Sequence, residues 1–89
     1  MAGPNRLDAA GNNVSFPTWA FSKSTKLCVR SLDPNNYGAV TVQCGDAAAE
    51  QLGCGGGQSN CIDREWGGAY VNVVNSRNDM TVPVDVWTE

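Results

Sequence analysis

Histidine is absent from this sequence of 89 residues. Its absence removes the commonest general base near neutral pH and excludes nucleophiles that depend on a serine–histidine or cysteine–histidine pair. A zinc ion would have to use all four cysteines, and their spacings contain no C-x-x-C pair of the kind that structural zinc sites favour. We therefore expect a protein that is not an enzyme and that holds no metal or other cofactor.

Long apolar runs and clusters of basic residues are also missing. No stretch approaches the ~20 apolar residues that a membrane span needs. The net charge is −3 with 17% charged residues, and no run of lysine or arginine is present. The electrostatic footprint of a nucleic-acid-binding protein is thus missing. We expect neither a membrane span nor a nucleic-acid partner.

Four cysteines in so short a chain indicate disulfide bonds. A core of this size is only marginally stable, and small domains of oxidising compartments are often cross-linked by an even number of cysteines. The segment from Met1 to Asn5 lacks a basic start followed by an apolar stretch, so no signal peptide is visible. We expect a secreted, extracellular protein in its mature form, with the signal peptide absent from this sequence.

The four cysteines Cys28, Cys44, Cys54 and Cys61 allow three pairings, between which the sequence does not choose. We favour Cys28–Cys61 with Cys44–Cys54, because the second bridge would join the two ends of the alanine-rich segment 45–52. Cys28–Cys44 with Cys54–Cys61 is the alternative, since the first pair lies on expected hairpin partners and the second would close a glycine loop. Two disulfides are expected in either case.

Short β-prone stretches separated by turn residues begin near residue 14. Apolar residues alternate with polar ones over 26–32, 39–44, 69–75 and 80–88, while 14–16, 18–21 and 61–65 are shorter candidates. The pattern predicts an all-β fold, a small antiparallel β-sandwich or barrel of six to seven short strands. It places a single β domain at residues 14–89, behind a flexible N-terminal tail at residues 1–13.

Two connections are open to interpretation. The turn residues at 33–38 predict a hairpin between 26–32 and 39–44. Residues 46–52 have good helix propensity but span only two turns, so they form either a helical turn or a loop that leads into a short strand.

Aromatic residues in turns are the best candidates for a binding site. Tyr37, Trp66 and Tyr70 lie in or beside turns rich in glycine and asparagine, and an exposed ring there offers a flat stacking face. The alternative is that such residues cap the ends of the sandwich, which is the favoured interpretation for Trp66 and even more so for Trp19 and Trp87.

Together these features predict a small acidic, secreted, non-enzymatic binding or recognition module, whose ligand is an extracellular glycan or a protein surface. The alternatives are a secreted inhibitor or antimicrobial-type effector, and a structural or assembly protein of a cell surface or particle.

Overall fold

The computed structural model describes residues 2–20 and 22–89. These residues form eight β-strands and no helix, so none of them belongs to a helix that could cross a membrane. The strands are β1 (Ala2–Leu7), β2 (Asn13–Phe16), β3 (Thr25–Ser31), β4 (Gly38–Gln43), β5 (Glu50–Cys54), β6 (Ser59–Arg64), β7 (Val71–Asn75) and β8 (Val84–Thr88). The predicted all-β class is confirmed, whereas the predicted count of six to seven strands is too low.

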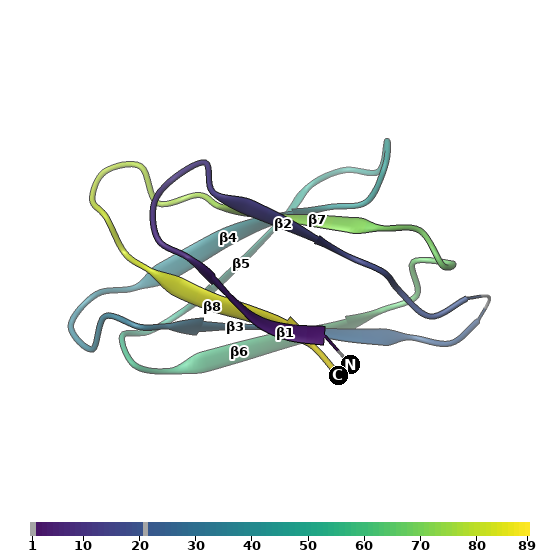
Figure 1. The fold of residues 1–89 in the computed structure, drawn as a ribbon, viewed down its shortest axis with the longest axis horizontal. Coiled ribbons are helices and arrows are strands. Elements are labelled where there is room, and N and C mark those ends of the chain that lie inside the picture. The colour runs from purple at the N-terminus through teal and green to yellow at the C-terminus, as the bar shows by residue number, and fades with distance from the viewer. Residues whose placement is uncertain (1, 21) are drawn as a thin grey trace.

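The strands form two antiparallel sheets of four, stacked face to face as a sandwich (Figure 1). Sheet A has the order β1-β8-β3-β6 and sheet B the order β2-β7-β4-β5. Every connection except β4–β5 passes from one sheet to the other. This strand order is that of an eight-stranded jelly roll, a double-sheet arrangement of two Greek keys.

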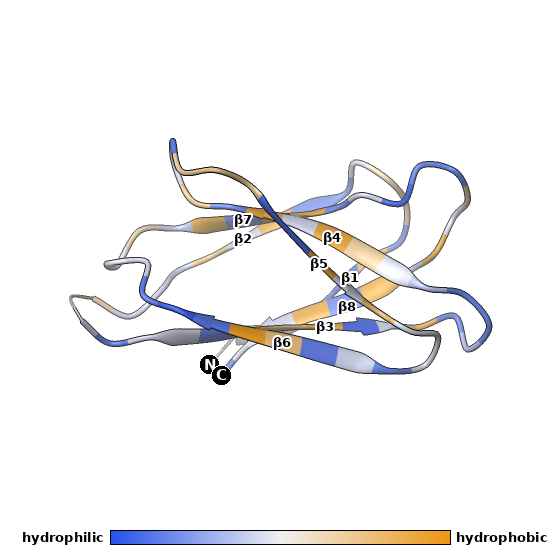
Figure 2. Cartoon of the chain, turned by 180° about the vertical axis from the view of Figure 1, so that it is seen from behind, coloured by the Kyte–Doolittle hydropathy of each residue, from blue (hydrophilic) through white to orange (hydrophobic). Residues whose placement is uncertain are grey.

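The core lies between the sheets and consists mainly of β-branched residues. Along β4, β7 and β8, buried positions alternate with partly exposed ones, and hydrophobic and polar colours alternate along much of the ribbon in Figure 2, so these strands turn one face inward. The fully buried side chains include Leu27, Val29, Val40, Val42, Val71, Val73, Val84 and Val86. Burial stabilises the fold by roughly 1.5–3 kcal/mol for each side chain of this size.

The N-terminal segment differs from the prediction of a tail. Residues 2–7 form β1, which pairs with β8 from Ala2↔Thr88 to Leu7↔Val84, while Met1 lies outside the described residues. Leu7 is only 4% exposed and joins the core. The prediction missed β1 because this edge strand is built by backbone pairing and the buried Leu7, and not by an alternating apolar pattern.

Two further local predictions have definite outcomes. Residues 46–52 contain no helix; a loop leads into β5 at Glu50, which was the alternative interpretation. Thr18, Trp19 and Ala20 are not in a strand, and Phe21 lies outside the described residues.

The predicted hairpin around residues 33–38 is wrong. β3 belongs to sheet A and β4 to sheet B, so the turn carries the chain across the sandwich. Alternation correctly identified the inward side chains of both strands, but it contains no information about which strand pairs with which. The hairpin within a sheet is β4–β5 instead.

One disulfide is present where two were predicted. Cys28 on β3 and Cys61 on β6 are bonded, whereas Cys44 and Cys54 are free. Cys54 lies opposite Gly38 in the β4–β5 hairpin. Cys44 is six residues beyond Gly38 along the chain, which at ~3.3 Å per strand residue places it about 20 Å away. The hairpin therefore separates the two thiols that were predicted to pair.

Candidate functional site

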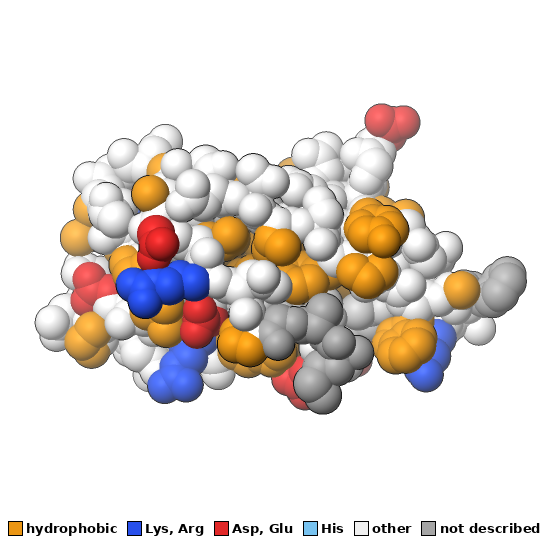
Figure 3. All heavy atoms as spheres, viewed as in Figure 1, with side chains coloured by type: hydrophobic (Ala, Val, Ile, Leu, Met, Phe, Trp, Pro, Cys, Tyr) orange, Lys and Arg blue, Asp and Glu red, His pale blue; other side chains and the backbone are white. Residues whose placement is uncertain are grey.

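The loops of the sandwich gather at two opposite ends (Figure 1). The β2–β3, β4–β5 and β6–β7 connections form one end, which we call the aromatic end: the described residues of 17–24, 44–49 and 65–70. The other four connections form the opposite end. Hydrophobic side chains reach the surface at the aromatic end, on the right of Figure 3, among backbone atoms and side chains of other kinds.

Trp19 is a main feature of the aromatic end. Its side chain is 45% exposed, and the Lys23 ammonium lies 4.1 Å from the centroid of its ring. Such a cation–π contact at an exposed site contributes about 0.5–1 kcal/mol. The Trp19 backbone N–H donates to Oγ1 of the buried Thr25 at 2.8 Å, which fastens the loop to the start of β3.

Tyr70 lies on the neighbouring loop and is 66% exposed. The two loops are joined directly, because the Thr18 hydroxyl donates to the carbonyl oxygen of Ala69 at 2.6 Å. Trp19 and Tyr70 each follow one of these two bonded residues along the chain. Their exposed rings are therefore presented by two connected loops.

Trp66 lies on the same loop as Tyr70. It is partly buried and packs against the hydrophobic core, so it anchors the β6–β7 loop. Gly68, with φ of +83°, continues the turn in a conformation that side-chain-bearing residues rarely adopt, and its backbone passes close to Ala20.

Tyr37 lies at the opposite end of the molecule. It is 53% exposed, and its ring covers Gly53 on β5, where a Cβ atom would collide with the ring. Its carbonyl oxygen accepts a hydrogen bond from Arg77 Nη1 at 2.5 Å. The structure thus brings Trp66 and Tyr70 to one end and leaves Tyr37 at the other.

Trp19 takes the place at the aromatic end that the prediction gave to Tyr37. Sequence reasoning favoured an end-capping role for it. The available signal was its context, since Pro17 interrupts the strand before it and the polar residues 22–24 follow it.

Charged groups at the opposite end stabilise turns. The Asp33 carboxylate accepts hydrogen bonds from the Asn35 backbone N–H at 2.9 Å and from Asn36 Nδ2 at 2.8 Å, and these lower the pKa of Asp33. The Arg77 guanidinium lowers the pKa of Asp79 through hydrogen bonds, and Asp79 in turn raises the pKa of Arg77. These hydrogen bonds favour the charged forms that prevail at neutral pH.

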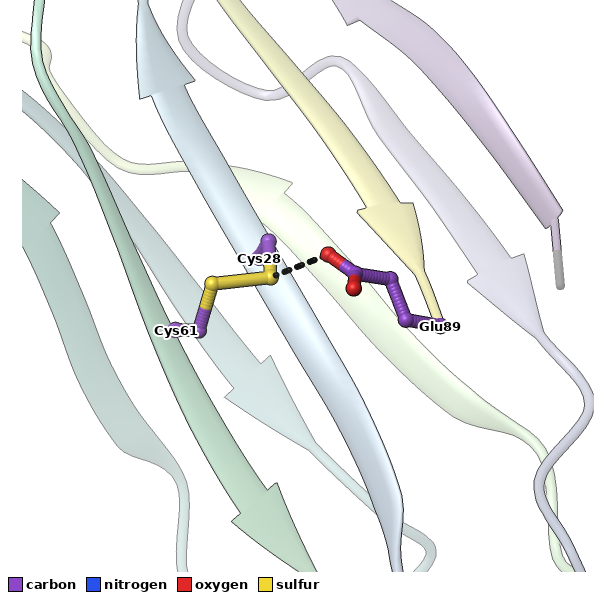
Figure 4. A group of neighbouring side chains, drawn as sticks. All are labelled: Cys28, Cys61 and Glu89. Carbon is purple, nitrogen blue, oxygen red and sulfur yellow. Dashed lines mark hydrogen bonds between the residues drawn. A yellow bond between two sulfur atoms is a disulfide. The ribbon is translucent and has the colours of Figure 1, made fainter.

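A second group of reactive side chains lies on the outer face of sheet A (Figure 4). Cys28 and Cys61 face each other across β3 and β6, with Cα atoms 4.1 Å apart. The carboxylate of Glu89 reaches to 3.5 Å from Cys28 Sγ, and Trp87 Nε1 donates to the same carboxylate oxygen at 3.0 Å. A disulfide sulfur carries no hydrogen, so the contact between Glu89 and Cys28 is a close approach of two acceptors.

Sequence comparison places the chain in a family. Residues 6–89 match the model of a family of unknown function, DUF8244. The chain belongs to this family. Two uncharacterized proteins of Dictyostelium discoideum are similar to it, at 34% and 33% identity over 88 residues, which is 99% of this chain and of each relative. No solved structure matches it.

In this DUF8244 member the two free cysteines occupy unlike surroundings. Cys54 is 6% exposed within the core, and burial raises the pKa of its thiol despite the opposing effect of a backbone hydrogen bond from Ser31. It therefore behaves as a small, protonated hydrophobic residue. Cys44 is partly buried and packs at the border of the core.

Proposed function

We propose that this protein is a non-enzymatic binding module that holds a glycan on its aromatic end. The observation that carries the proposal is the pair of exposed rings of Trp19 and Tyr70 on two loops joined by the Thr18–Ala69 hydrogen bond. A loop site held on a rigid sheet scaffold is a common arrangement for recognition. Because the loops are tied together, the rings need little ordering when a ligand arrives.

The composition of the aromatic end favours a sugar over a protein. A sugar ring has an apolar C–H face, which can stack on an aromatic ring, and hydroxyl groups at its edge. The Lys23 ammonium beside Trp19 offers donors to such hydroxyl groups.

The small area of the aromatic end also favours a sugar over a protein as the ligand. A standard protein interface covers about 800 Å² on each partner, which would be about one sixth of the 4865 Å² surface of this chain. The exposed rings of Trp19 and Tyr70 form a smaller platform than that.

The fold is compatible with this function but does not specify it. Jelly rolls occur in lectin domains, and also in viral capsids and cupins. Since one fold supports many functions, the loop residues support the proposed function and the architecture does not.

We propose an extracellular location for the same protein. The Cys28–Cys61 disulfide supports it, because such bonds persist mainly in oxidising compartments. The free Cys44 and Cys54 contribute no such support, so the proposal depends on one bond.

A glycan array followed by tryptophan-fluorescence titration tests the binding function. Trp19→Ala and Tyr70→Ala should each weaken binding about tenfold or more, since central aromatic residues contribute more than about 1.4 kcal/mol. Tyr37→Ala is the matched control, because Tyr37 has a similar exposure at the opposite end. Circular dichroism should show that all three variants keep the fold.

Two results would reject this proposal. One is the absence of any bound glycan on the array. The other is a loss in Tyr37→Ala equal to that in Tyr70→Ala, which would move the site away from the aromatic end.

A further inference from the structure

The Cys28–Cys61 disulfide has an unusual position for a structural cross-link. It joins two strands that are already hydrogen-bonded over six residue pairs, from Thr25↔Arg64 to Arg30↔Ser59. It does not connect the two sheets. β3 is also paired with β8 on its other side. The backbone pairing therefore holds the two cysteines opposite each other whether or not the sulfur atoms are bonded.

We propose that the Cys28–Cys61 pair is a redox-controlled metal site, which binds a zinc ion through both sulfurs and the Glu89 carboxylate once the disulfide is reduced. The proposal is independent of glycan binding, because this site lies on the outer face of sheet A and not among the loops of the aromatic end.

Proximity is the first argument. Cys28, Cys61 and Glu89 form a group of potential ligands within the described part of the chain, and their ligand atoms all lie within 4.8 Å of one another (Figure 4). Two thiolates and a carboxylate are ligands that zinc accepts in proteins, with a water molecule as the fourth ligand of a tetrahedron.

The spacing of the strands suits a shared ion. With Zn–S bonds of ~2.3 Å, the sulfur atoms of a tetrahedral site lie about 3.8 Å apart. Cys28 and Cys61 lie opposite each other with Cα atoms 4.1 Å apart, and the Cβ atoms of disulfide-bonded cysteines lie about 3.5–4.5 Å apart. Rotation of the two cysteine side chains is therefore sufficient to hold one ion between them, and the strands need not move.

Glu89 is already oriented toward the cysteines. The Trp87 indole N–H donates to the carboxylate oxygen that approaches Cys28 Sγ. Outer hydrogen bonds of this kind fix the position of a metal ligand and tune its affinity. Trp87 is a positioning residue in this arrangement, and Glu89 is a ligand.

Charges on the same face balance the site. Lys26 and Arg30 lie two positions before and after Cys28, so they share its face of β3 and favour thiolates there. Each faces a carboxylate across the sheet, Lys26↔Asp63 and Arg30↔Asp85. A zinc ion would therefore meet two thiolates and the Glu89 carboxylate, beside these two pairs of oppositely charged residues.

The reduction step follows ordinary thiol–disulfide exchange with a dithiol as reductant. Cys28 is fully buried and Cys61 is partly exposed, so the dithiol thiolate attacks Cys61 Sγ and Cys28 leaves as a thiolate. The second thiol of the reductant then displaces Cys61 and closes its own disulfide. Two electrons pass from the dithiol to the protein, and zinc takes the place of the protons on the two cysteines.

The experiment uses the full chain with Cys44→Ser and Cys54→Ala, so that only one cysteine pair remains. A phosphine reduces the disulfide without adding a competing thiol. Cobalt(II) is the spectroscopic probe, because thiolate ligation gives charge-transfer absorption and a tetrahedral site gives strong visible bands. Zinc affinity is then measured by competition with a chromophoric chelator, and amide NMR spectra follow the β3–β6 pairing.

We expect the reduced chain to bind one equivalent of cobalt, which zinc displaces, and the oxidised chain to bind none. Glu89→Gln should weaken zinc binding at least about tenfold, and Trp87→Phe by about 10- to 100-fold, the range for a lost outer hydrogen bond. Glu65→Gln, an exposed glutamate just beyond β6, should leave the affinity unchanged.

Three results would overturn the proposal. The first is zinc binding by a Cys28→Ser/Cys61→Ser chain as strong as that of the reduced pair. The second is equal affinity of Glu89→Gln and Glu65→Gln. The third is separation of β3 from β6 on reduction, because the site depends on strands that stay paired without the disulfide.

Discussion

Asn75 is the buried polar residue on which the opposite end of the sandwich depends. Its side chain is 1% exposed, and its Nδ2 donates to the carbonyl oxygens of Leu7 and Val82, both at 3.0 Å. Its Oδ1 accepts from the Arg77 backbone N–H at 3.1 Å. One amide thus joins the end of β1, the end of β7 and the residues just before β8.

Replacement of Asn75 by aspartate keeps the shape of the side chain but turns the donor Nδ2 into an oxygen that accepts hydrogen bonds. A carboxylate would direct an oxygen at two carbonyl oxygens that have lost their donor. Each buried group left unsatisfied costs about 1–3 kcal/mol, and an unpaired buried charge costs about 3–5 kcal/mol. We expect Asn75→Asp to lose about 3–5 kcal/mol at neutral pH, whereas Asn75→Ala should lose about 2–4 kcal/mol. A domain of this size has a total stability of roughly 5–13 kcal/mol.

The pH dependence distinguishes this reasoning from a general packing defect. Burial among acceptors should raise the pKa of the introduced carboxyl above its unfolded value of about 3.9. The protonated form can donate to one carbonyl, so Asn75→Asp should regain stability as the pH falls through that raised pKa. Asn75→Ala has no such group and should not recover.

Urea unfolding followed by tryptophan fluorescence measures these differences. Asn72→Asp is the matched control, because Asn72 lies on the same strand with its amide bonded to exposed side chains of Asn13 and Ser15. It should change stability by no more than about 0.5 kcal/mol. Equal stability of Asn75→Asp and Asn72→Asp, or the lack of any recovery in acid, would refute the reasoning.

Three further predictions concern single contacts. Gly56→Ala should destabilise the fold by about 1–3 kcal/mol in chemical denaturation, because a Cβ would lie 2.6 Å from the Pro34 carbonyl oxygen. Asp33→Asn should be less stable than the wild type at neutral pH, and thermal unfolding should show this difference disappearing in acid: the lowered pKa gives stability that is full above the ordinary 3.8 and is lost as the pH falls through the folded-state value. Cys28→Ser/Cys61→Ser should lose at most about 3.7 kcal/mol, the chain-entropy value for a loop of 33 residues, and should stay folded.

Each of these predictions has a comparison variant. Gly55→Ala should cost less than Gly56→Ala, since the colliding group is the flexible side chain of Gln58. Asp46→Asn alters an exposed carboxyl in the β4–β5 loop and should change stability at neutral pH less than Asp33→Asn does. Cys44→Ser should leave stability nearly unchanged. If a comparison variant lost as much stability as the variant it is paired with, the contact on which that prediction rests would be contradicted.

The side-chain faces of the strands could be predicted from the sequence, whereas the pairing of the strands could not. Alternation correctly placed Val40 and Val42 inward, and it separated Leu27 and Val29 from Cys28. It assigned β3 and β4 to one hairpin because consecutive strands often pair. In this fold nearly every connection crosses between the sheets, which depends on the packing of the whole chain.

The candidate site was predicted only in part, because local sequence places residues in loops but does not determine which loops lie together. Trp66 and Tyr70 both lie within the β6–β7 connection, beside Gly67 and Gly68, so local sequence was enough to place them at a loop. Tyr37 lies in the β3–β4 connection, which was predicted as a turn, whereas Trp19 lies in the β2–β3 connection, where residues 18–21 were predicted as a strand. Only the topology decides which loops share an end. It places Trp19, and not Tyr37, at the same end as Trp66 and Tyr70. The free Cys44 and Cys54 have the same explanation, because their separation follows from the register of one hairpin.

The order of the strands also has a consequence for synthesis of the chain. β7 and β8 are interior strands of their sheets, although they come last in the sequence. β1 and β3 of sheet A can be joined only through β8, and β2 and β4 of sheet B only through β7. On the ribosome, the first three quarters of the chain therefore have no complete sheet to form, and long-range pairing of this kind is slow. The two sheets must therefore wait for residues 71–88, which supply β7 and β8, before they can be completed.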